Sequence, residues 1–361
     1  MKKLFSCLAL LFFQSLCLAS TDPFQIVNRT SDLDPNDPNQ NAVLTALNSA
    51  ADQIENTINT TFLSDASQQT FVSAMAEANA SNSNALIVDR ASNPQKFSVG
   101  ILAQGNTYSL NSGAFETNNS FPSAGAAGQA SLSIGVNASK LGISKIGFID
   151  GKKLMLYING SRFSYSMDKA TVGLTNFGFN AQYKIIEKKG NHFFGWGGLD
   201  ASLGVNYGNN SLLYAANIKQ STTTTVNGQT ASVNVDMDYS FGIDSWNLNF
   251  PLEISSNVNF LYAFSLFAGG GVDFNVGSTA LKGSASGPVT ASASTQAGGG
   301  NLFSANSSLN LENGISGKPS LVTARGFGGL QLNLAVLKVV VEGHALSNKT
   351  IGAAAMIRVA L

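Results

Sequence analysis

The sequence predicts an all-β protein, a transmembrane antiparallel up-and-down β-barrel preceded by a short N-terminal helical segment. Three observations support this prediction: an export signal, repeated alternation of apolar and polar residues, and a scarcity of charge. Charged side chains make up 12% of the 361 residues, against roughly 25% in ordinary soluble domains. A low charge content suits a chain whose outer wall faces hydrocarbon.

The start of the chain has the pattern of a secretory signal peptide. Two lysines precede an apolar run, residues 4–16, and small residues near Ala19 fit a cleavage site. We expect residues 1–19 to be removed and the protein to reach the outer membrane of a Gram-negative bacterium. Attachment of a lipid at Cys17 is the less favoured alternative, because a bulky leucine precedes that cysteine.

The composition excludes several classes of protein. Both cysteines, Cys7 and Cys17, lie within the predicted signal, so we expect the exported chain to have no disulfide and no cysteine metal site. Without Lys2 and Lys3, 19 basic residues stand against 21 acidic ones, which provides no basic surface for nucleic acid. We therefore expect no metal, no cofactor and no nucleic-acid partner.

Alternation of apolar and polar residues is the main sign of the barrel. No segment after the signal approaches 18 consecutive apolar residues, so a helical membrane span is not expected. Segments of about ten alternating residues are instead typical of barrel strands. Thirteen segments show the pattern: 97–103, 130–138, 154–167, 177–185, 199–207, 211–219, 232–244, 246–254, 260–276, 304–311, 330–334, 337–341 and 351–361.

Bacterial single-chain barrels have an even number of strands, so we predict about 12, with 14 as the alternative. Segment 304–311 is the weakest, because it lies within residues 282–318, a Ser-, Ala- and Gly-rich stretch that predicts one long outer loop. The pair Asn227-Gly228 predicts a two-residue hairpin. Between Leu334 and Leu337 the apolar parity changes without a usual turn residue. The barrel is expected to occupy residues 96–361.

Residues 20–95 have a helical character instead. Asp37-Pro38 fits a helix start, and a second helix is predicted from Asp65, where Gln68 completes a capping-box spacing. One apolar stripe follows the first start: Leu44, Leu47, Ala51, Ile54 and Ile58. This segment is either a periplasmic extension that packs on the barrel rim or a plug that folds into the lumen, since a stripe shows only that one face is covered.

The polar parity of the strands predicts which side chains face the lumen. The candidates are Lys184, Asp200, Asp236, Asp238, Glu253, Asp273, Arg325, Lys338, Glu342, His344 and Arg358. The acidic members are densest in the middle strands and the basic ones near the C-terminus. This segregation predicts either a transverse field like that of diffusion porins, or local ion pairs that seal a narrow lumen.

Two resemblances add to this reading. The final strand, with Ile357, Val359 and Leu361 on its outward face, resembles that of bacterial outer-membrane barrel proteins, although those usually end in Phe or Trp. This resemblance implies outer-membrane lipid and the barrel-assembly machinery as partners. The helical lead-in, the small-residue segment 74–84 and Asn93-Pro94 resemble long-chain fatty-acid transporters, which implies a plug and hydrophobic solutes.

The predicted function is therefore a porin-like or transport channel for small solutes. The alternatives are a structural or surface-interaction protein, for which the predicted long loop is the best argument, and a hydrophobic-solute transporter with a plug. We predict no enzymatic activity. His344 and Ser347 lie on opposite faces of a strand by parity, so they do not form a nucleophile and base pair.

Overall fold

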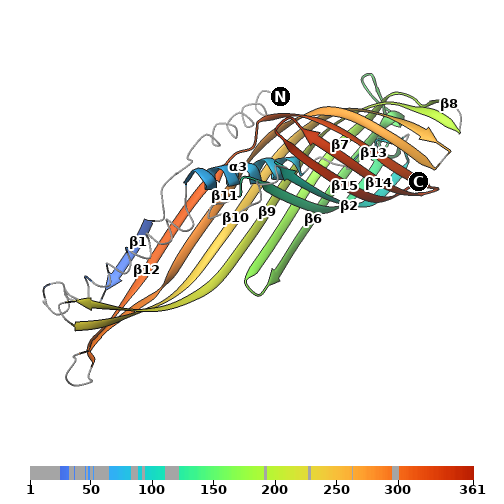
Figure 1. The fold of residues 1–361 in the computed structure, drawn as a ribbon. Helices are drawn as coiled ribbons and strands as arrows, with labels where there is room; N and C mark the ends of the chain where they lie inside the picture. The colour runs from blue at the N-terminus through green and yellow to red at the C-terminus, as the bar shows by residue number, and fades with distance from the viewer. Residues whose placement is uncertain are drawn as a thin grey trace.

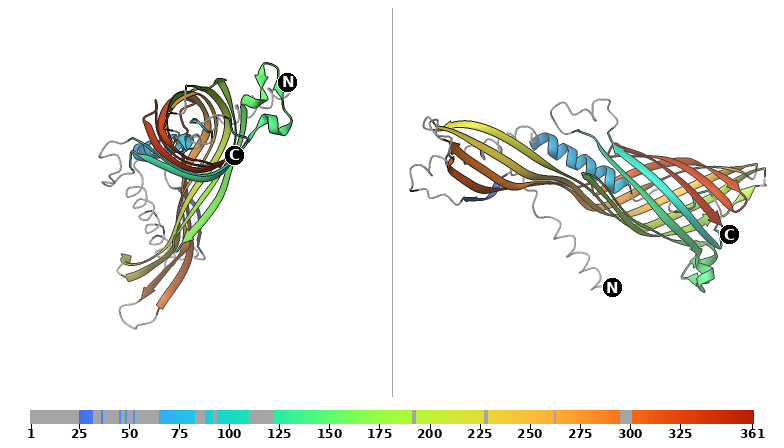
Figure 2. Two further views of the ribbon diagram at one scale, coloured as in Figure 1. Left: turned by 90° about the vertical axis from the view of Figure 1, so that its right-hand side faces the viewer. Right: turned by 90° about the horizontal axis from the view of Figure 1, so that it is seen from below.

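The computed structural model describes residues 25–31, 36, 45, 48, 52, 65–82, 88–91, 94–109, 122–190, 193–226, 229–261, 263–294 and 301–361. Ten antiparallel strands form a closed ring, seen nearly end-on in Figure 2. Around the ring they are β2 (Phe97–Tyr108), β3 (Gly125–Asn137), β6 (Leu154–Met167), β7 (Ala170–Ile186), β9 (Phe194–Val226), β10 (Gln229–Phe260), β11 (Phe264–Ser294), β13 (Val322–Leu334), β14 (Leu337–Leu346) and β15 (Thr350–Ala360). Pairing of β11 with β13 and of β15 with β2 closes the circle.

The ring has an apolar outer face and a largely polar inner face. In β2, Ile101 is 66% exposed, whereas Gln104 and Asn106 on the opposite parity are buried. Leu132 of β3 and Ile357 of β15 are likewise exposed. A protein dissolved in water would bury such side chains, so this arrangement fits a wall in contact with lipid. The predicted transmembrane β-barrel is confirmed.

None of the described helices combines the length and hydropathy that a membrane-spanning helix needs.

The ring has ten strands rather than the expected 12, because long strands absorb several sequence signals. β9 is 33 residues long and β10 is 32. β9 covers segments 199–207 and 211–219, and β10 covers 232–244 and 246–254. Segment 304–311 belongs to β12 (Asn301–Gly317), which pairs with the distal part of β11 and lies outside the ring.

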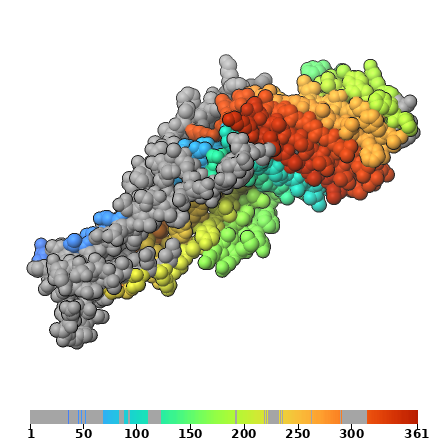
Figure 3. Space-filling model, in the orientation of Figure 1, coloured from blue at the N-terminus to red at the C-terminus, as the bar shows by residue number. Residues whose placement is uncertain are grey.

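β9, β10 and β11 continue past the ring into an open sheet, which we call the extension (Figure 1). β12 and β1 (Gln25–Ser31) complete it in the order β9-β10-β11-β12-β1. The predicted loop 282–318 is thus mostly strand among its described residues, because β10 pairs with β11 from Phe264 as far as Ser294. Ser, Ala and Gly do not favour a strand by themselves, and the neighbouring strands supply the ladder. Figure 3 shows coloured atoms of β9 and β10 (yellow) projecting beyond the strands of the ring.

The apolar face of the sheet changes sides where the ring ends. Within the ring, Trp246 and Ile254 of β10 are exposed on the outside, while Ile243, three residues before Trp246, is buried on the inner side. Strand pairing continues without a break across Asp244 and Ser245. The interruption in alternation at these residues therefore marks a change of environment, from lipid outside the ring to protein inside the extension.

Helix α3 (Asp65–Ser81) is the protein that covers this inner side. It begins at Asp65, as the capping pattern predicts. Its Val72 packs with Ile243, Leu281 and Ile315, which lie side by side on three adjacent strands. Glycines allow a close approach of the helix: a Cβ on Gly125 would lie 2.2 Å from the backbone of Ala74. The helix thus sits at the mouth of the ring, on the side of the extension (Figure 1).

The opposite end of the ring, which we call the terminal rim, holds both ends of the barrel. Lys96 N donates to Leu361 O at 2.7 Å, and Leu361 N donates to Phe97 O at 2.9 Å. The turn between β13 and β14 also lies at this rim, and Ala335 adopts φ 54° there. A single left-handed residue thus makes the turn for which the sequence offers no Gly or Asn. Short elements β4 (Lys145–Ile146), β5 (Ile149–Asp150) and β8 (Lys189–Gly190) and 3-10 helices η1 (Ala138–Leu141) and η2 (Gly151–Lys153) complete the described secondary structure.

The predicted signal (1–19), the apolar stripe of the first predicted helix (Leu44 to Ile58) and the turn pair Asn227-Gly228 lie outside the described residues. The strands that flank the turn pair are in place, since Val226 pairs with Gln229.

Placing a charge on the lipid face tests the membrane assignment. Ile101→Arg should destabilise the barrel by about 2–4 kcal/mol, because the guanidinium would lie in hydrocarbon. The measurement is urea unfolding in lipid vesicles, followed by the heat-dependent change in gel migration. Asn234→Arg, at an exposed site of the extension, is the control and should change little. Equal stability of the two variants would show that this face does not contact lipid.

Candidate functional site in the barrel lumen

The described residues from the end of α3 to the start of β2 contact the interior of the ring at several depths. Near the mouth, Ser320 N and Asn348 Nδ2 donate to the carboxylate of Glu77 at 2.9 and 2.5 Å. Further down, Gln104 Nε2 donates to Ser81 O at 3.1 Å, and Asn106 Nδ2 donates to Asn82 Oδ1 at 3.2 Å. Next come residues 88–91, which we call the lumen segment. All four are buried.

Arg90 of the lumen segment binds an acidic cluster on the wall. Its guanidinium contacts Glu253 of β10, with Nη2 2.9 and 2.8 Å from the two carboxylate oxygens, and also pairs with Glu342 of β14. Arg325 of β13 pairs with the same Glu253 and, through Nε, with Asp273 at 3.1 Å. All five side chains are buried, so the partners of these charges are protein groups rather than water, with three carboxylates against two guanidinium groups.

Asp89, by contrast, binds positively charged side chains of the wall. Its carboxylate lies 3.0 Å from Lys338 Nζ of β14 and 3.4 Å from Arg358 Nη1 of β15. The backbone is held too: Gln182 Nε2 donates to Asp89 O at 2.6 Å, and Asn257 Nδ2 donates to Arg90 O at 3.0 Å. Side chains from β7, β10, β14 and β15 therefore converge on two consecutive residues.

The wall alone is not electrically balanced around these two residues. The acidic cluster has three carboxylates and one guanidinium, Arg325, while the basic cluster consists of Lys338 and Arg358. Arg90 supplies positive charge to the first cluster and Asp89 supplies negative charge to the second. A further buried pair, Lys184 and Asp200 at 2.7 Å, is neutral by itself. The Asp-Arg dipeptide is thus complementary to the wall in both sign and position.

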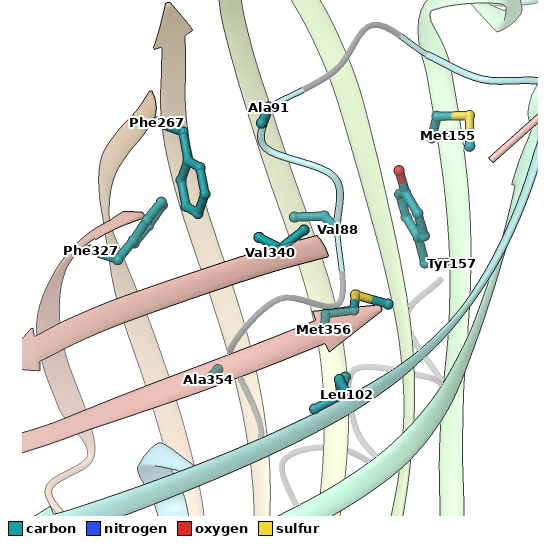
Figure 4. Close-up of a cluster of buried hydrophobic side chains, with 10 residues drawn as sticks. All are labelled: Val88, Ala91, Leu102, Met155, Tyr157, Phe267, Phe327, Val340, Ala354 and Met356. Atoms are coloured by element: carbon teal, nitrogen blue, oxygen red, sulfur yellow. The ribbon is translucent and has the colours of Figure 1, made fainter. Parts of the chain in front are cut away.

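Apolar side chains surround the ion pairs. The Arg90 guanidinium carbon lies 4.2 Å from the centre of the Phe327 ring, within cation–π range. Tyr157 Oη, which donates to Gln182 at 3.1 Å, lies 3.4 Å from Asp89 N. Figure 4 shows the buried cluster: Val88, Ala91, Leu102, Met155, Tyr157, Phe267, Phe327, Val340, Ala354 and Met356. The space beside Asp89, lined also by Lys184 and Asp200, leaves no room for a water molecule.

Most of the predicted lumen residues are buried in this interior. They are Lys184, Asp200, Glu253, Asp273, Arg325, Lys338, Glu342, His344 and Arg358. The lumen segment brings Glu253, Glu342, Lys338 and Arg358 into one network. The sequence did not single out Asp89, Arg90 or Tyr157. The available signal was one adjacent charged pair, Asp89-Arg90, within the otherwise uncharged stretch 78–93.

Asp236 and Asp238 lie elsewhere. They belong to the part of β10 beyond the ring, on the polar outer face of the extension, so they do not face the lumen. Asn217 Nδ2 donates to Asp236 at 2.7 Å and to Asp238 at 3.1 Å, and Lys219 Nζ lies 2.9 Å from Asp236. The hydrogen bond from Asn217 has the largest effect and that from Lys219 the next largest, and both hold the pKa of Asp236 below its usual value. The parity argument failed here because it placed every alternating segment in the barrel wall, whereas Asp236 and Asp238 lie in the part of β10 beyond the ring.

His344 and Ser347 lie in different surroundings. His344 is buried, with Nε2 2.6 Å from Asn106 Oδ1, whereas Ser347 is exposed and its Oγ accepts from Ala324 N at 3.0 Å. The two side chains therefore do not meet. Within the described part of the chain, no three His, Cys, Asp or Glu side chains are grouped so as to hold a metal ion.

A closed antiparallel ring with an apolar outer wall and a polar interior is the architecture of bacterial outer-membrane barrels. Within this class the chain belongs to the Lsa36-like family, whose model matches residues 36–361. A comparison with curated protein sequences finds no significant match.

Several solved structures are similar to the chain. The attachment invasion locus protein Ail of Yersinia pestis is 9% identical, with 74% of this chain and 98% of Ail covered and a TM-score of 0.22. The toluene transporter TbuX of Ralstonia pickettii is 8% identical, with 81% and 99% covered and a TM-score of 0.26. The translocator domain of the autotransporter NalP from Neisseria meningitidis is 8% identical, with 74% and 88% covered and a TM-score of 0.25.

Removing the Arg90 charge should destabilise the whole barrel. Arg90→Gln leaves Glu253 and Glu342 without their shared partner in a buried site, which typically costs about 3–5 kcal/mol. Unfolding by urea in lipid vesicles measures the loss. Lys282→Gln is the matched control: it breaks an exposed pair with Asp244 (3.2 Å), which should cost less than about 1 kcal/mol. If Arg90→Gln unfolds at the same urea concentration as the control, the lumen ion pairs do not stabilise the barrel.

Proposed function

We propose that the protein is an outer-membrane barrel whose sealed ring anchors a β-sheet for interaction outside the cell. In this proposal the barrel-assembly machinery inserts the ring into outer-membrane lipid, and residues 20–95 supply the plug. The observation that carries the proposal is the lumen segment. Asp89 and Arg90 bind buried charges on different strands of the wall and, with their apolar neighbours, occupy the interior at this depth, which is not the arrangement of an open pore.

The extension supports the interaction role. Its outer face carries amide, hydroxyl and charged side chains, and a groove of about 440 Å³ is lined there by Lys169, Ala215, Ala216, Asn217, Asp238, Tyr239, Ser240, Ser284 and Ser286. Barrels of this class have short periplasmic turns and long extracellular connections. In this proposal the long extension lies outside the cell, and the terminal rim, which carries the two-residue turn Ala335–Val336 and the longer connection 138–153, lies in the periplasm.

A channel for small solutes is the second candidate. One observation favours it: the described obstruction comes largely from a non-strand segment, Val88–Ala91, that side-chain contacts hold in place. Displacement of this segment would expose two wall clusters of opposite charge, which is the transverse field of a diffusion pore. A hydrophobic-solute transporter would require the same displacement.

Conductance in planar bilayers separates the two candidates. The sealed anchor should give no steady single-channel current. A variant that loses both lumen charges, Asp89→Ala with Arg90→Ala, should conduct or show current bursts, because its segment no longer matches the wall. Steady channels in the unsubstituted protein would contradict the sealed-anchor proposal and favour the channel.

Shortening the extension tests its role. Deleting residues 216–226 and 229–239 joins Ala215 to Ser240 through Asn227-Gly228, and these two positions already face each other in the β9–β10 ladder. The ring should remain heat-modifiable on gels, because the contact of α3 with Ile243 lies outside the deletion. Cells that carry the shortened protein should lose adhesion to immobilised polysaccharides and proteins that bind cells with the full chain. Unchanged adhesion would show that the distal β9–β10 hairpin does not mediate the interaction.

A further inference from the structure

The two ends of the N-terminal segment lie on opposite sides of the ring. Residues 25–31, in β1, pair with residues 307–312 of β12, far out on the extension. Phe97, where β2 begins, lies at the terminal rim and is hydrogen-bonded to Leu361. The chain must therefore pass from one side of the barrel to the other between these points.

The contacts of this segment show the route. Going down the chain, Val72 meets Ile315 beyond the ring and Glu77 meets Asn348 at the mouth. Asn82 then meets Asn106, the lumen segment meets Glu253 and Arg358, and Lys96 meets Leu361 at the terminal rim. Each step is closer to the rim than the one before, so the chain crosses inside the ring and not around it.

The length of the segment is sufficient for the crossing. Residues 82–97 are sixteen residues, which extend over at most about 55 Å, and the hydrocarbon core of a bilayer is about 30 Å thick. The charges also require the interior route. Asp89 and Arg90 would be costly to expose to lipid on the outer wall, whereas the lumen offers both a partner of opposite charge.

We propose that the barrel has a second activity: it carries the N-terminal part of its own chain, including β1 and α3, through its lumen to the cell surface. This inference rests on the proposed outer-membrane placement, in which the terminal rim faces the periplasm. The ion pairs of Asp89 and Arg90 with the wall then hold the translocated chain at a fixed position in the lumen. In the displayed part, α3 covers the apolar row of Ile243, Leu281 and Ile315 at the base of the extension, and β1 pairs with β12 farther out.

Single cysteines test the proposal, because both cysteines of the sequence precede the predicted cleavage site and the unsubstituted chain gives the labelling background. The reporter is Asn36→Cys, an exposed residue five positions past the end of β1. Ser166→Cys, in the exposed β6–β7 hairpin, reports the extension side, and Lys188→Cys, in the exposed β7–β9 connection, reports the terminal rim. The probe is a membrane-impermeant maleimide, applied to intact cells and to cells with a permeabilised outer membrane.

We expect Asn36→Cys and Ser166→Cys to be labelled on intact cells, and Lys188→Cys to stay at background until the membrane is permeabilised. If Asn36→Cys instead behaves like Lys188→Cys while Ser166→Cys is labelled, the proposed passage of the N-terminal part to the cell surface is overturned. The outer-membrane placement of the barrel would still hold in that case. If Ser166→Cys is not labelled on intact cells, the outer-membrane placement fails and the inference fails with it.

A buried reporter tests the interior route separately. Ala91→Cys should resist the maleimide in intact and permeabilised cells and react only after heat denaturation, because Ala91 is buried in the lumen. Val88→Cys is a second reporter of the same kind, and heat-dependent gel migration shows that each variant is folded. Labelling of both folded variants in permeabilised cells would overturn the passage through the lumen.

Discussion

The structure depends on the pairing of two consecutive residues, Asp89 and Arg90, with charges on the barrel wall. A ring of ten strands can close with all its backbone hydrogen bonds made, but the charged side chains that face inward still need partners of opposite charge. The wall separates acidic and basic groups, and the lumen segment bridges the two clusters. Without the lumen segment, the closed ring would leave each of the two wall clusters without one of its buried ionic partners.

The sequence predicts the barrel because the physical cause is local. Lipid on one side and polar contacts on the other impose a period of two on every strand, and Ile101 and Gln104 show it without reference to distant residues. The burial of Glu253, Lys338 and Arg358 follows from the same parity. The identity of their partners does not follow from parity. Arg90 is 163 residues from Glu253 and 252 from Glu342, and it lies within a segment that has no periodicity.

The strand count and the loop 282–318 show a second limit of the sequence. Alternation shows that one face of a strand is apolar. It does not show whether lipid or a helix covers that face, because both favour the same pattern. At Asp244 and Ser245 the apolar face moves from the lipid side to the side of α3, and the sequence registers this change as a break. Likewise, Ser- and Gly-rich residues 283–294 form strand because β10 and β12 hold them on both sides.

The separation of the lumen partners along the chain also constrains the order of folding. Lys338 lies 249 residues after Asp89, so the contact forms only after nearly the whole protein has been synthesised. Loop closure over such distances is slow, and proteins dominated by distant contacts fold slowly. Asp89 therefore has neither of its ionic partners until β14 and β15 have been made, whereas Glu253, a partner of Arg90, comes earlier in the chain. The last strands to be made thus complete the ordering of a segment near the start of the chain.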